Sequence, residues 1–286
     1  AMNERFSTRV MEIAPEAVDA YLARLMRDRA SIDKPAAAVA QPRVIGRVAV
    51  VPVYGVMDSA DDSWGGTIST AHIERTIAAL GADKAVKTIV LDIDSPGGSV
   101  YGIPELGATV RDVASRKRVI AVANPMAASA AYWLASQARE IAVTPSGEVG
   151  SIGVISVHAD WSGYLEQAGI KTTVITSSEH KGEFSPYAAL SEDAKAEMQR
   201  RVDHFDGMFT SAVAQGRGVT PTRVRADFGA GRMVEAGRAK SLGMADRVAT
   251  FDEVMSRLIA DQADLDRVRA AVAHVEMIAL GAGVAR

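Results

Sequence analysis

Three short segments, together with Lys181, carry the residues best suited to chemistry, and the first segment is the turn DSPGG at 94–98. Gly97 and Gly98 carry no Cβ, so a substrate can approach their main-chain N–H groups closely. Two such donors can stabilise the oxyanion that develops during acyl transfer. The same pair also suits an ordinary turn between a strand and a helix.

The second segment is NPMAASAAYW at 124–133, which contains Ser129. Asn124 can cap a helix and Pro125 suits a first helical position, so the sequence predicts Ser129 near a helix start. The positive end of that helix would favour an alkoxide-like transition state, and the flanking alanines leave room for a substrate. A lone serine here is also typical of tight helix packing.

A serine hydroxyl needs a base to remove its proton before it becomes a good nucleophile. Lys181 is one candidate, since lysines act as bases where burial or neighbouring charges lower their pKa. Taken alone, it also fits an ordinary surface lysine. The chain has five histidines, none in a motif typical of a Ser-His-Asp enzyme: His72, His158, His180, His204 and His274.

The third segment is the glycine-rich stretch at 147–154, which includes Ser151. A serine hydroxyl such as that of Ser151 can orient a lysine amine by hydrogen bonding. The alternative is that it only satisfies a backbone group of its own loop.

Composition narrows the classes of protein. The 286 residues contain 32 Lys plus Arg against 35 Asp plus Glu, a net charge of −3, which argues against nucleic-acid or anionic-lipid partners. There is no cysteine, which excludes disulfides, thiolate zinc sites and cysteine nucleophiles. No leader and no apolar run of about 20 residues is apparent, so we expect a soluble, cytoplasmic protein without a membrane anchor.

Strand-like and helix-like segments alternate, which predicts an α/β fold with a parallel sheet. Consecutive apolar residues indicate strands covered on both faces. The expected strands lie at 47–57, 88–93, 118–123, 140–143, 151–157 and 171–176, and the expected helices at 71–82, 99–115, 125–137, 191–216, 235–242 and from 251 onward.

We expect three regions along the chain. An N-terminal helix at 15–29 and a linker at 30–42 make up residues 1–42. A catalytic domain follows at 43–250, and a helical tail occupies 251–286.

Together, these segments resemble the S49 serine peptidases, the family of bacterial signal peptide peptidase A, and especially its phage and prophage capsid-maturation branch. The resemblance covers roughly residues 45–250. The matching blocks are DIDSPGGSV at 92–100, NPMAASAAYWLAS at 124–136, VGSIGV at 149–154, HKGEFSP at 180–186 and GRMVEAGRAKSLGMADRV at 231–248.

The resemblance implies a Clp protease/crotonase-like fold with repeated ββα units. It also implies a Ser-Lys dyad in which Ser129 is the nucleophile and Lys181 the general base. Gly97 and Gly98 become the oxyanion hole, and Ser151 the residue that orients the lysine. The implied reaction is hydrolysis of peptide bonds in unfolded or scaffold-type polypeptides through an acyl-enzyme, with no metal or organic cofactor.

The expected partners are polypeptide substrates, including scaffold or portal proteins, and further copies of the chain. The resemblance implies a homo-oligomer, since in several relatives the subunits form a ring-like dome in which the serine and the lysine come from neighbouring protomers or from tandem halves. Ala130 and Ala131 stand where cellular members commonly have glycines. With no anchor and no tandem second half, the chain is expected to be a phage-type, procapsid-associated head maturation protease.

Two alternatives stay open. One is a crotonase-like acyl-CoA enzyme, in which oxyanion amides also polarise a carbonyl, although no glutamate pair is evident near Gly97 or Ser129. The other is a catalytically silent assembly protein on the same fold, which would require neither Ser129 nor Lys181.

Overall fold

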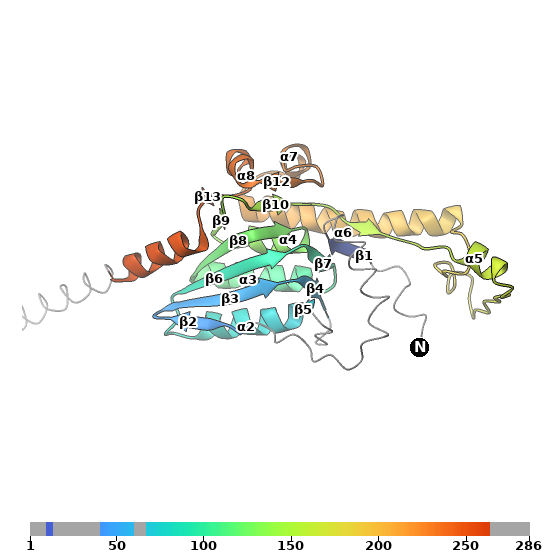
Figure 1. The fold of residues 1–286 in the computed structure, drawn as a ribbon, viewed down its shortest axis with the longest axis horizontal. Coiled ribbons are helices and arrows are strands. Elements are labelled where there is room, and N and C mark those ends of the chain that lie inside the picture. The colour runs from blue at the N-terminus through green and yellow to red at the C-terminus, as the bar shows by residue number, and fades with distance from the viewer. Residues whose placement is uncertain (1–9, 14–40, 60–66, 264–286) are drawn as a thin grey trace, which may run out of the picture.

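The computed structural model describes residues 10–13, 41–59 and 67–263 (Figure 1). The expected N-terminal helix at 15–29 and nearly all of the linker lie outside these residues. Within them, no helix is both long enough and apolar enough to cross a bilayer.

The main sheet has a parallel centre with antiparallel edges (Figure 1). Strands β3, β6, β8 and β9 run parallel, while β2 and β12 pair antiparallel with their neighbours. The strands are β2 (Arg43–Ile45), β3 (Val48–Tyr54), β6 (Thr88–Ser95), β8 (Arg118–Ala128), β9 (Glu140–Val143), β10 (Glu148–Gly150), β12 (Met233–Glu235) and β13 (Arg247–Val248).

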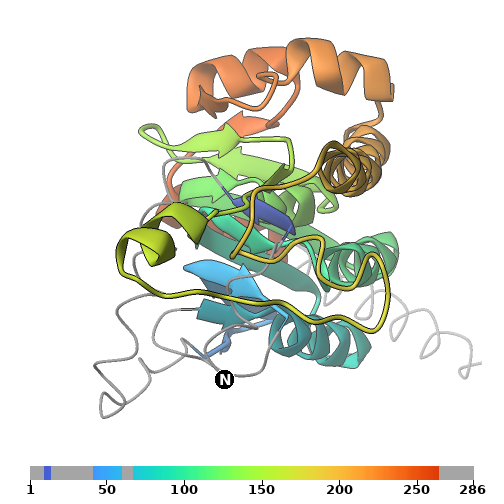
Figure 2. The same ribbon diagram turned by 90° about the vertical axis from the view of Figure 1, so that its right-hand side faces the viewer.

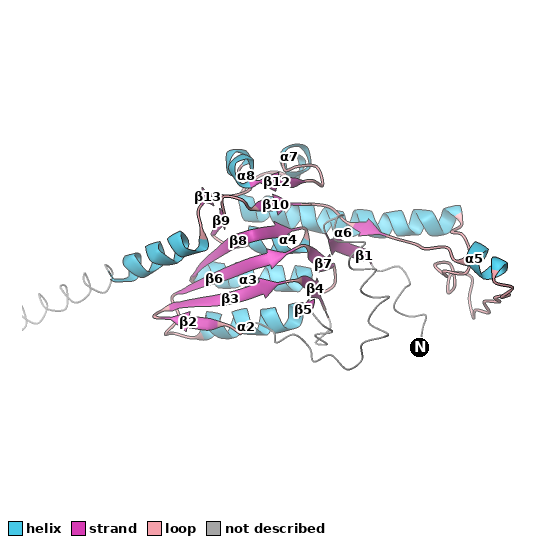
Figure 3. Ribbon diagram, viewed as in Figure 1, coloured by secondary structure: helices cyan, strands magenta, loops and turns pink. Residues whose placement is uncertain are grey.

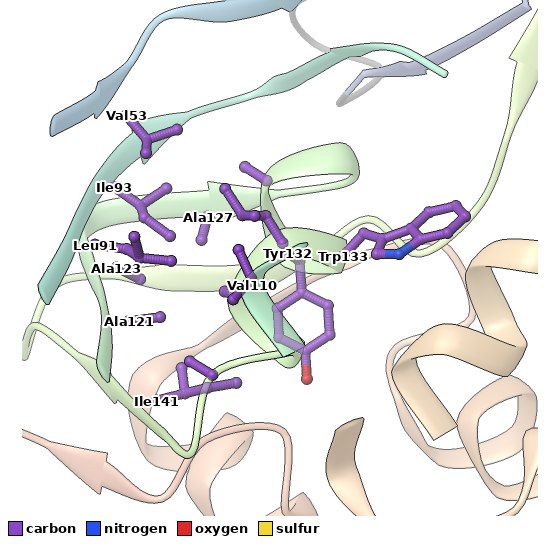
Figure 4. Packing of buried hydrophobic residues seen from close by; sticks show 14 of the residues in the cluster. Val53, Leu91, Ile93, Val110, Ala121, Ala123, Ala127, Tyr132, Trp133 and Ile141 are labelled. Atoms are coloured by element: carbon purple, nitrogen blue, oxygen red, sulfur yellow. The ribbon is translucent and has the colours of Figure 1, made fainter. Parts of the chain in front are cut away.

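Both faces of this sheet are buried, which explains the unbroken apolar runs in its strands. On one face, Leu91, Ile93 and Ala123 pack with Tyr132 and the helix residue Val110 (Figure 4). On the other face, Val90 and Ile120 pack against Leu258 of the helical residues 251–263. The expected helix from 251 is therefore present and covers one face of the sheet.

Helices α2, α3, α4 and α6 lie together on one side of the sheet (Figure 3). Helix α6 is long and extends beyond the sheet, and Figure 2 looks at the outer end of this helix. Ser69, Ser191 and Thr220 cap α2, α6 and α7 by accepting main-chain hydrogen bonds. The helices are α2 (Thr70–Ala82), α3 (Ile103–Arg116), α4 (Ala130–Ser136), α5 (Ser162–Gln167), α6 (Glu192–Arg217), α7 (Pro221–Asp227) and α8 (Ala236–Leu242).

A second, smaller sheet lies at the carboxyl end of the main strands. Its strand order is β11-β1-β7-β4-β5. The strands are β1 (Val10–Ile13), β4 (Val56–Asp58), β5 (Thr67–Ser69), β7 (Gly97–Ser99) and β11 (Ile155–Ser156).

Two consecutive units show how the sheets are connected. Strand β3 is followed by β4 and β5 of the small sheet and then by α2, and β6 is followed by β7 and then by α3. This repeated order confirms the expected α/β fold with ββα units.

Glycines explain two differences from the sequence-based expectations. The strand expected at 47–57 is divided at Gly55, whose φ of 91° lets the chain leave one sheet for the other. The turn expected at 94–98 contains the start of β7 instead. A Cβ on Gly98 would lie 1.9 Å from the Met57 carbonyl oxygen, so only glycine allows these strands to pack together.

Two further expectations are wrong. The helix expected at 125–137 begins only at Ala130, because β8 continues to Ala128 and pairs with β10 there. Asn124 and Pro125 therefore belong to the strand and do not cap a helix. Residues 171–176 form no strand in the structure. They belong to an extended arm, residues 157–190, that carries α5 and reaches the outer end of α6 (Figure 1).

Candidate active site

Ser129 lies between the last residue of β8 and the first residue of α4, close to a helix start as expected. Its φ of 53° and ψ of −121° are uncommon for a residue with a side chain, and such strain costs about 1–3 kcal/mol. The Ser129 N–H donates to the Gly150 carbonyl at 2.7 Å, and the Ser129 carbonyl accepts from the Trp133 N–H at 2.9 Å. These two hydrogen bonds hold the strained residue in place.

The Ser129 hydroxyl is buried and, among the described residues, has no hydrogen-bond partner. Leaving a buried hydroxyl unpaired costs about 1–3 kcal/mol. Native proteins rarely keep such a group without a use for it. Its sequence neighbours Ala127, Ala128, Ala130 and Ala131 are also buried and offer no polar side chain. Both the strain and the unpaired hydroxyl mark Ser129 as a candidate nucleophile.

Large aromatic residues fix α4 in position. The Tyr132 hydroxyl donates to the Met244 carbonyl at 2.9 Å, and burial raises the pKa of Tyr132, which keeps it a donor. Trp133 stacks on Phe209 of α6, with ring centroids 5.1 Å apart. Helix α4 therefore holds Ser129 against a rigid core.

The two glycines of the predicted oxyanion hole lie close to this helix, since β7 contacts α4. Both are buried, and Gly97 has a φ of 93°. Ser95, two residues earlier, pairs with Ala127 of β8. The Gly97 N–H donates to the Ser95 hydroxyl at 3.2 Å, while that hydroxyl donates to the Gly55 carbonyl. The Gly97 donor is thus held by a long hydrogen bond, which an oxyanion could replace.

Ser151 lies beside Ser129 in the main chain. Gly150 is paired with Ala128 in the parallel ladder, so the next residue on each strand is a serine. Ser151 is buried and has a φ of 53°, the same value as Ser129. Its N–H donates to the Arg232 carbonyl at 2.9 Å. The structure therefore brings Ser129, Ser151 and the glycine pair to one end of the sheet.

Lys181 is not part of this group within one chain. It is exposed in the arm, and its neighbours His180 and Glu183 line a pocket with Glu197 of α6. Phe209, which contacts Trp133 of α4, lies on α6 twelve residues after Glu197. At 1.5 Å per residue, these two levels of α6 are about 18 Å apart. Figure 1 shows the arm at the far end of α6 from the sheet.

A polar cluster that the sequence analysis missed joins the carboxyl ends of three main strands. The buried Asp92 carboxylate accepts a hydrogen bond from the Tyr54 hydroxyl at 2.5 Å and from the Asn124 side chain at 3.1 Å. Burial, and then this contact with Asp92, raises the pKa of Tyr54. The sequence feature that indicates this cluster is an aspartate, Asp92, within the apolar run TIVLDI at 88–93. The cluster fixes the strands that lead to Gly97 and Ser129.

No group of three or more metal-binding side chains occurs in the described part of the chain. The residues assembled around Ser129 are hydroxyl and main-chain groups. Such groups suit nucleophilic attack and oxyanion stabilisation.

The sequence matches the model of peptidase family S49 over residues 111–266, which is more than half of the chain. The chain belongs to peptidase family S49. This confirms the resemblance noted from its motifs. The family match includes Ser129, Ser151 and Lys181, whereas Gly97 and Gly98 precede it.

Curated relatives of this S49 chain include phage proteins. It is 31% identical to the head-tail preconnector protein GP5 of Enterobacteria phage P21, over 75% of this chain and 43% of the relative. It is 34% identical to the capsid assembly protease C of Escherichia phage lambda, over 62% of this chain and 41% of the relative. The chain thus spans less than half of either phage protein.

A cellular relative is the putative signal peptide peptidase SppA of Enterococcus faecium, 29% identical over 62% of this chain and 51% of the relative. Among solved structures, a point mutant of ClpP1 from Listeria monocytogenes matches with a TM-score of 0.43 and 15% identity. That match covers 70% of this chain and 91% of the ClpP1 chain. A likeness this weak adds nothing to the fold described above.

Proposed function

We propose that this chain is a serine endopeptidase in which Ser129 attacks the peptide carbonyl and Lys181 acts as the general base. The observation that carries the proposal is the strained, buried and unpartnered Ser129 hydroxyl at the start of α4, in a chain of family S49. A positioned base typically accelerates such a reaction by about 10²–10⁴.

The chemistry follows in two steps. The neutral Lys181 amine removes the Ser129 proton, the serine oxygen bonds to the carbonyl carbon, and the leaving amine takes that proton. Water then gives a proton to Lys181 and attacks the acyl carbon; the ester bond breaks, Ser129 takes up that proton, and the carboxyl product leaves. The Gly97 and Gly98 N–H groups stabilise the oxyanion, and one such donor is worth about 10²–10³ in rate. Ser151 helps to hold the lysine amine.

The Ala130 N–H is a further candidate donor that the sequence analysis did not consider. It is the first amide of α4, and the first amides of a helix have no partner within that helix. Because it directly follows the nucleophile, we include it among the proposed oxyanion donors.

We further propose that the dyad forms between two copies of the chain. Ser129 lies in the core, whereas Lys181 lies on the arm beside the outer half of α6. The arm also exposes large apolar side chains, including Trp161, Tyr164 and Ile175. Such side chains on an extended arm favour burial against a neighbouring subunit. A ring of copies would bring Lys181 of one to Ser129 of the next.

The natural substrates that fit best are scaffold-type or portal polypeptides inside a phage procapsid. This part of the proposal rests on the two phage relatives, one named a capsid assembly protease and the other a head-tail preconnector protein. The enzyme would then act where the procapsid assembles.

Labelling with a fluorophosphonate tests the proposed nucleophile. The purified chain should become labelled and should hydrolyse fluorescent casein, while Ser129→Ala should do neither. Ser146→Ala is the matched control, because Ser146 is an exposed serine in the loop before β10. Labelling that survives Ser129→Ala would contradict the assignment. Acyl-CoA turnover without labelling would favour the crotonase-like alternative. If neither casein nor acyl-CoA were turned over, the result would favour the catalytically silent assembly protein.

A further inference from the structure

Strand β1 occupies a position between two strands that do not otherwise pair. It runs antiparallel to β7 on one side, with Met11 opposite Ser99 and Ile13 opposite Gly97. On its other side it runs antiparallel to β11, with Met11 opposite Ile155. Figure 1 shows β1 beside β7. Both neighbours of β1 lie far from it in sequence.

Removing β1 would leave facing edges on β7 and β11, each with unpaired main-chain groups. The observed order is β11-β1-β7, so the gap between them fits one extended strand. Main-chain pairing reads the backbone and accepts many side-chain sequences. The gap is therefore suited to bind an extended polypeptide.

The direction of β1 relates this gap to the proposed nucleophile. Ile13, the last residue of β1, lies opposite Gly97, the first residue of β7. Gly97 is the end of β7 nearest Ser129, since Ser95 pairs with Ala127 just before the serine. A polypeptide bound like β1 would therefore run toward Ser129 and present a carbonyl beside the Gly97 donor.

We propose that Val10–Ile13 is an intramolecular pseudosubstrate, which occupies the peptide-binding groove between β7 and β11 until a polypeptide substrate displaces it. The proposal rests on the proposed function for the identity of the displaced ligand. Binding of substrate then requires β1 to leave, so the apparent association constant for substrate is the intrinsic one multiplied by the fraction of chains whose groove is free.

A binding measurement tests this independently of catalysis. The probe is a fluorescent peptide with the sequence of residues 8–15, TRVMEIAP. Its binding is followed by fluorescence anisotropy on the full-length Ser129→Ala chain, so that no cleavage interferes. Three further variants are built on this background.

Glu12→Pro disrupts β1 in place. Glu12 lies opposite Gly98 in a strand that is paired on both sides, and proline is poorly tolerated in the interior of such a strand. This variant should bind the peptide at least about fivefold more tightly, as expected if β1 fills the groove in about 80% of chains. Glu12→Val is the matched control, because valine suits a strand and should leave peptide binding unchanged.

A disulfide between β1 and β11 would hold β1 in the groove, which is the opposite of disrupting it with proline. The chain has no cysteine, so Met11→Cys with Ile155→Cys introduces the only two thiols. These residues are direct antiparallel partners, whose Cα separation of about 4.5–5.5 Å suits a disulfide. Oxidation should abolish peptide binding by locking β1 in the groove, and reduction should restore it.

Equal peptide affinity in the reference, Glu12→Pro and oxidised disulfide variants would overturn the proposal. Absence of peptide binding to Glu12→Pro would overturn it as well. If the wild-type chain failed to hydrolyse casein while these binding results held, only the proposed function would fail.

Discussion

Ser129 donates its main-chain N–H to the Gly150 carbonyl at 2.7 Å, and this hydrogen bond ties the end of β8 to the end of β10. The next residues on the two strands, Ser129 and Ser151, share a φ of 53°. Two strained serines thus lie side by side where the small sheet meets α4. Backbone strain of this kind persists only where the surroundings impose it, and it gathers at functional sites.

The strain at Ser129 predicts a difference between two inactive variants. Ser129→Ala keeps a Cβ at a φ of 53°, whereas Ser129→Gly relieves the strain. After the larger chain entropy of unfolded glycine is subtracted, we expect the glycine variant to be more stable by about 0.5–2 kcal/mol. Urea unfolding measures this, and both variants should lack casein hydrolysis. A glycine variant less stable than the alanine variant would show that the conformation is not strained.

Gly98 predicts a steric limit in β7. In Gly98→Ala, the new Cβ would lie 1.9 Å from the Met57 carbonyl oxygen, which forces β4 and β7 apart. We expect a loss of about 1–3 kcal/mol in the free energy of unfolding, as overpacking usually costs. The free energy is measured by urea unfolding. Gly153→Ala is the control, because a Cβ on Gly153 would meet no atom within 4 Å. Equal stability of the two variants would contradict the strand contact.

The pair formed by Arg217 and Asp246 predicts a dependence of stability on pH. Two hydrogen bonds join them, at 3.0 and 2.7 Å. Burial opposes the charge of Asp246, but Arg217 and the Ile141 N–H outweigh it and hold the pKa of Asp246 below its usual value. Since the folded-state pKa is lowered, the stabilisation is present above about pH 3.9 and is lost as the pH falls through the folded-state pKa.

Asp246→Asn should therefore cost about 1.5–3 kcal/mol at pH 7, toward the lower value because the carboxylate is partly exposed to solvent. The difference from the wild type should shrink below about pH 4. Urea unfolding at several pH values measures both effects. Asp227→Asn removes an exposed pair with Arg223, 3.6 Å apart, and should change stability by less than about 0.5 kcal/mol. A difference that stays constant with pH would argue against the lowered pKa.

The sequence predicted those elements whose pattern is decided locally. The strand at 140–143 is present with the expected bounds, and the expected helix at 191–216 is α6 to within one residue at each end. Both have clear signals, a short apolar run in the first and a capping serine in the second. Ser129 does lie at a helix start, but the helix begins at Ala130 and not at Pro125 as the motif predicted.

The remaining features depend on contacts between distant segments. Asn124 and Pro125 resemble a helix start, yet pairing of β8 with β10 extends the strand through them. Val10–Ile13 has no periodic pattern of its own and becomes a strand only between β7 and β11. The separation of Lys181 from Ser129 follows from the length of α6 and the course of the arm, which no local motif encodes.

Co-expression of Ser129→Ala and Lys181→Ala chains tests most directly whether Ser129 of one copy works with Lys181 of another. Ser129→Ala and Lys181→Ala chains should each be inactive, while assemblies containing both in equal amounts should regain about a quarter of wild-type casein hydrolysis, since about one seam in four joins an intact serine to an intact lysine. Lys171→Ala, which alters another exposed lysine of the arm, should keep its activity. Mixed assemblies as inactive as either parent would contradict a dyad shared between copies.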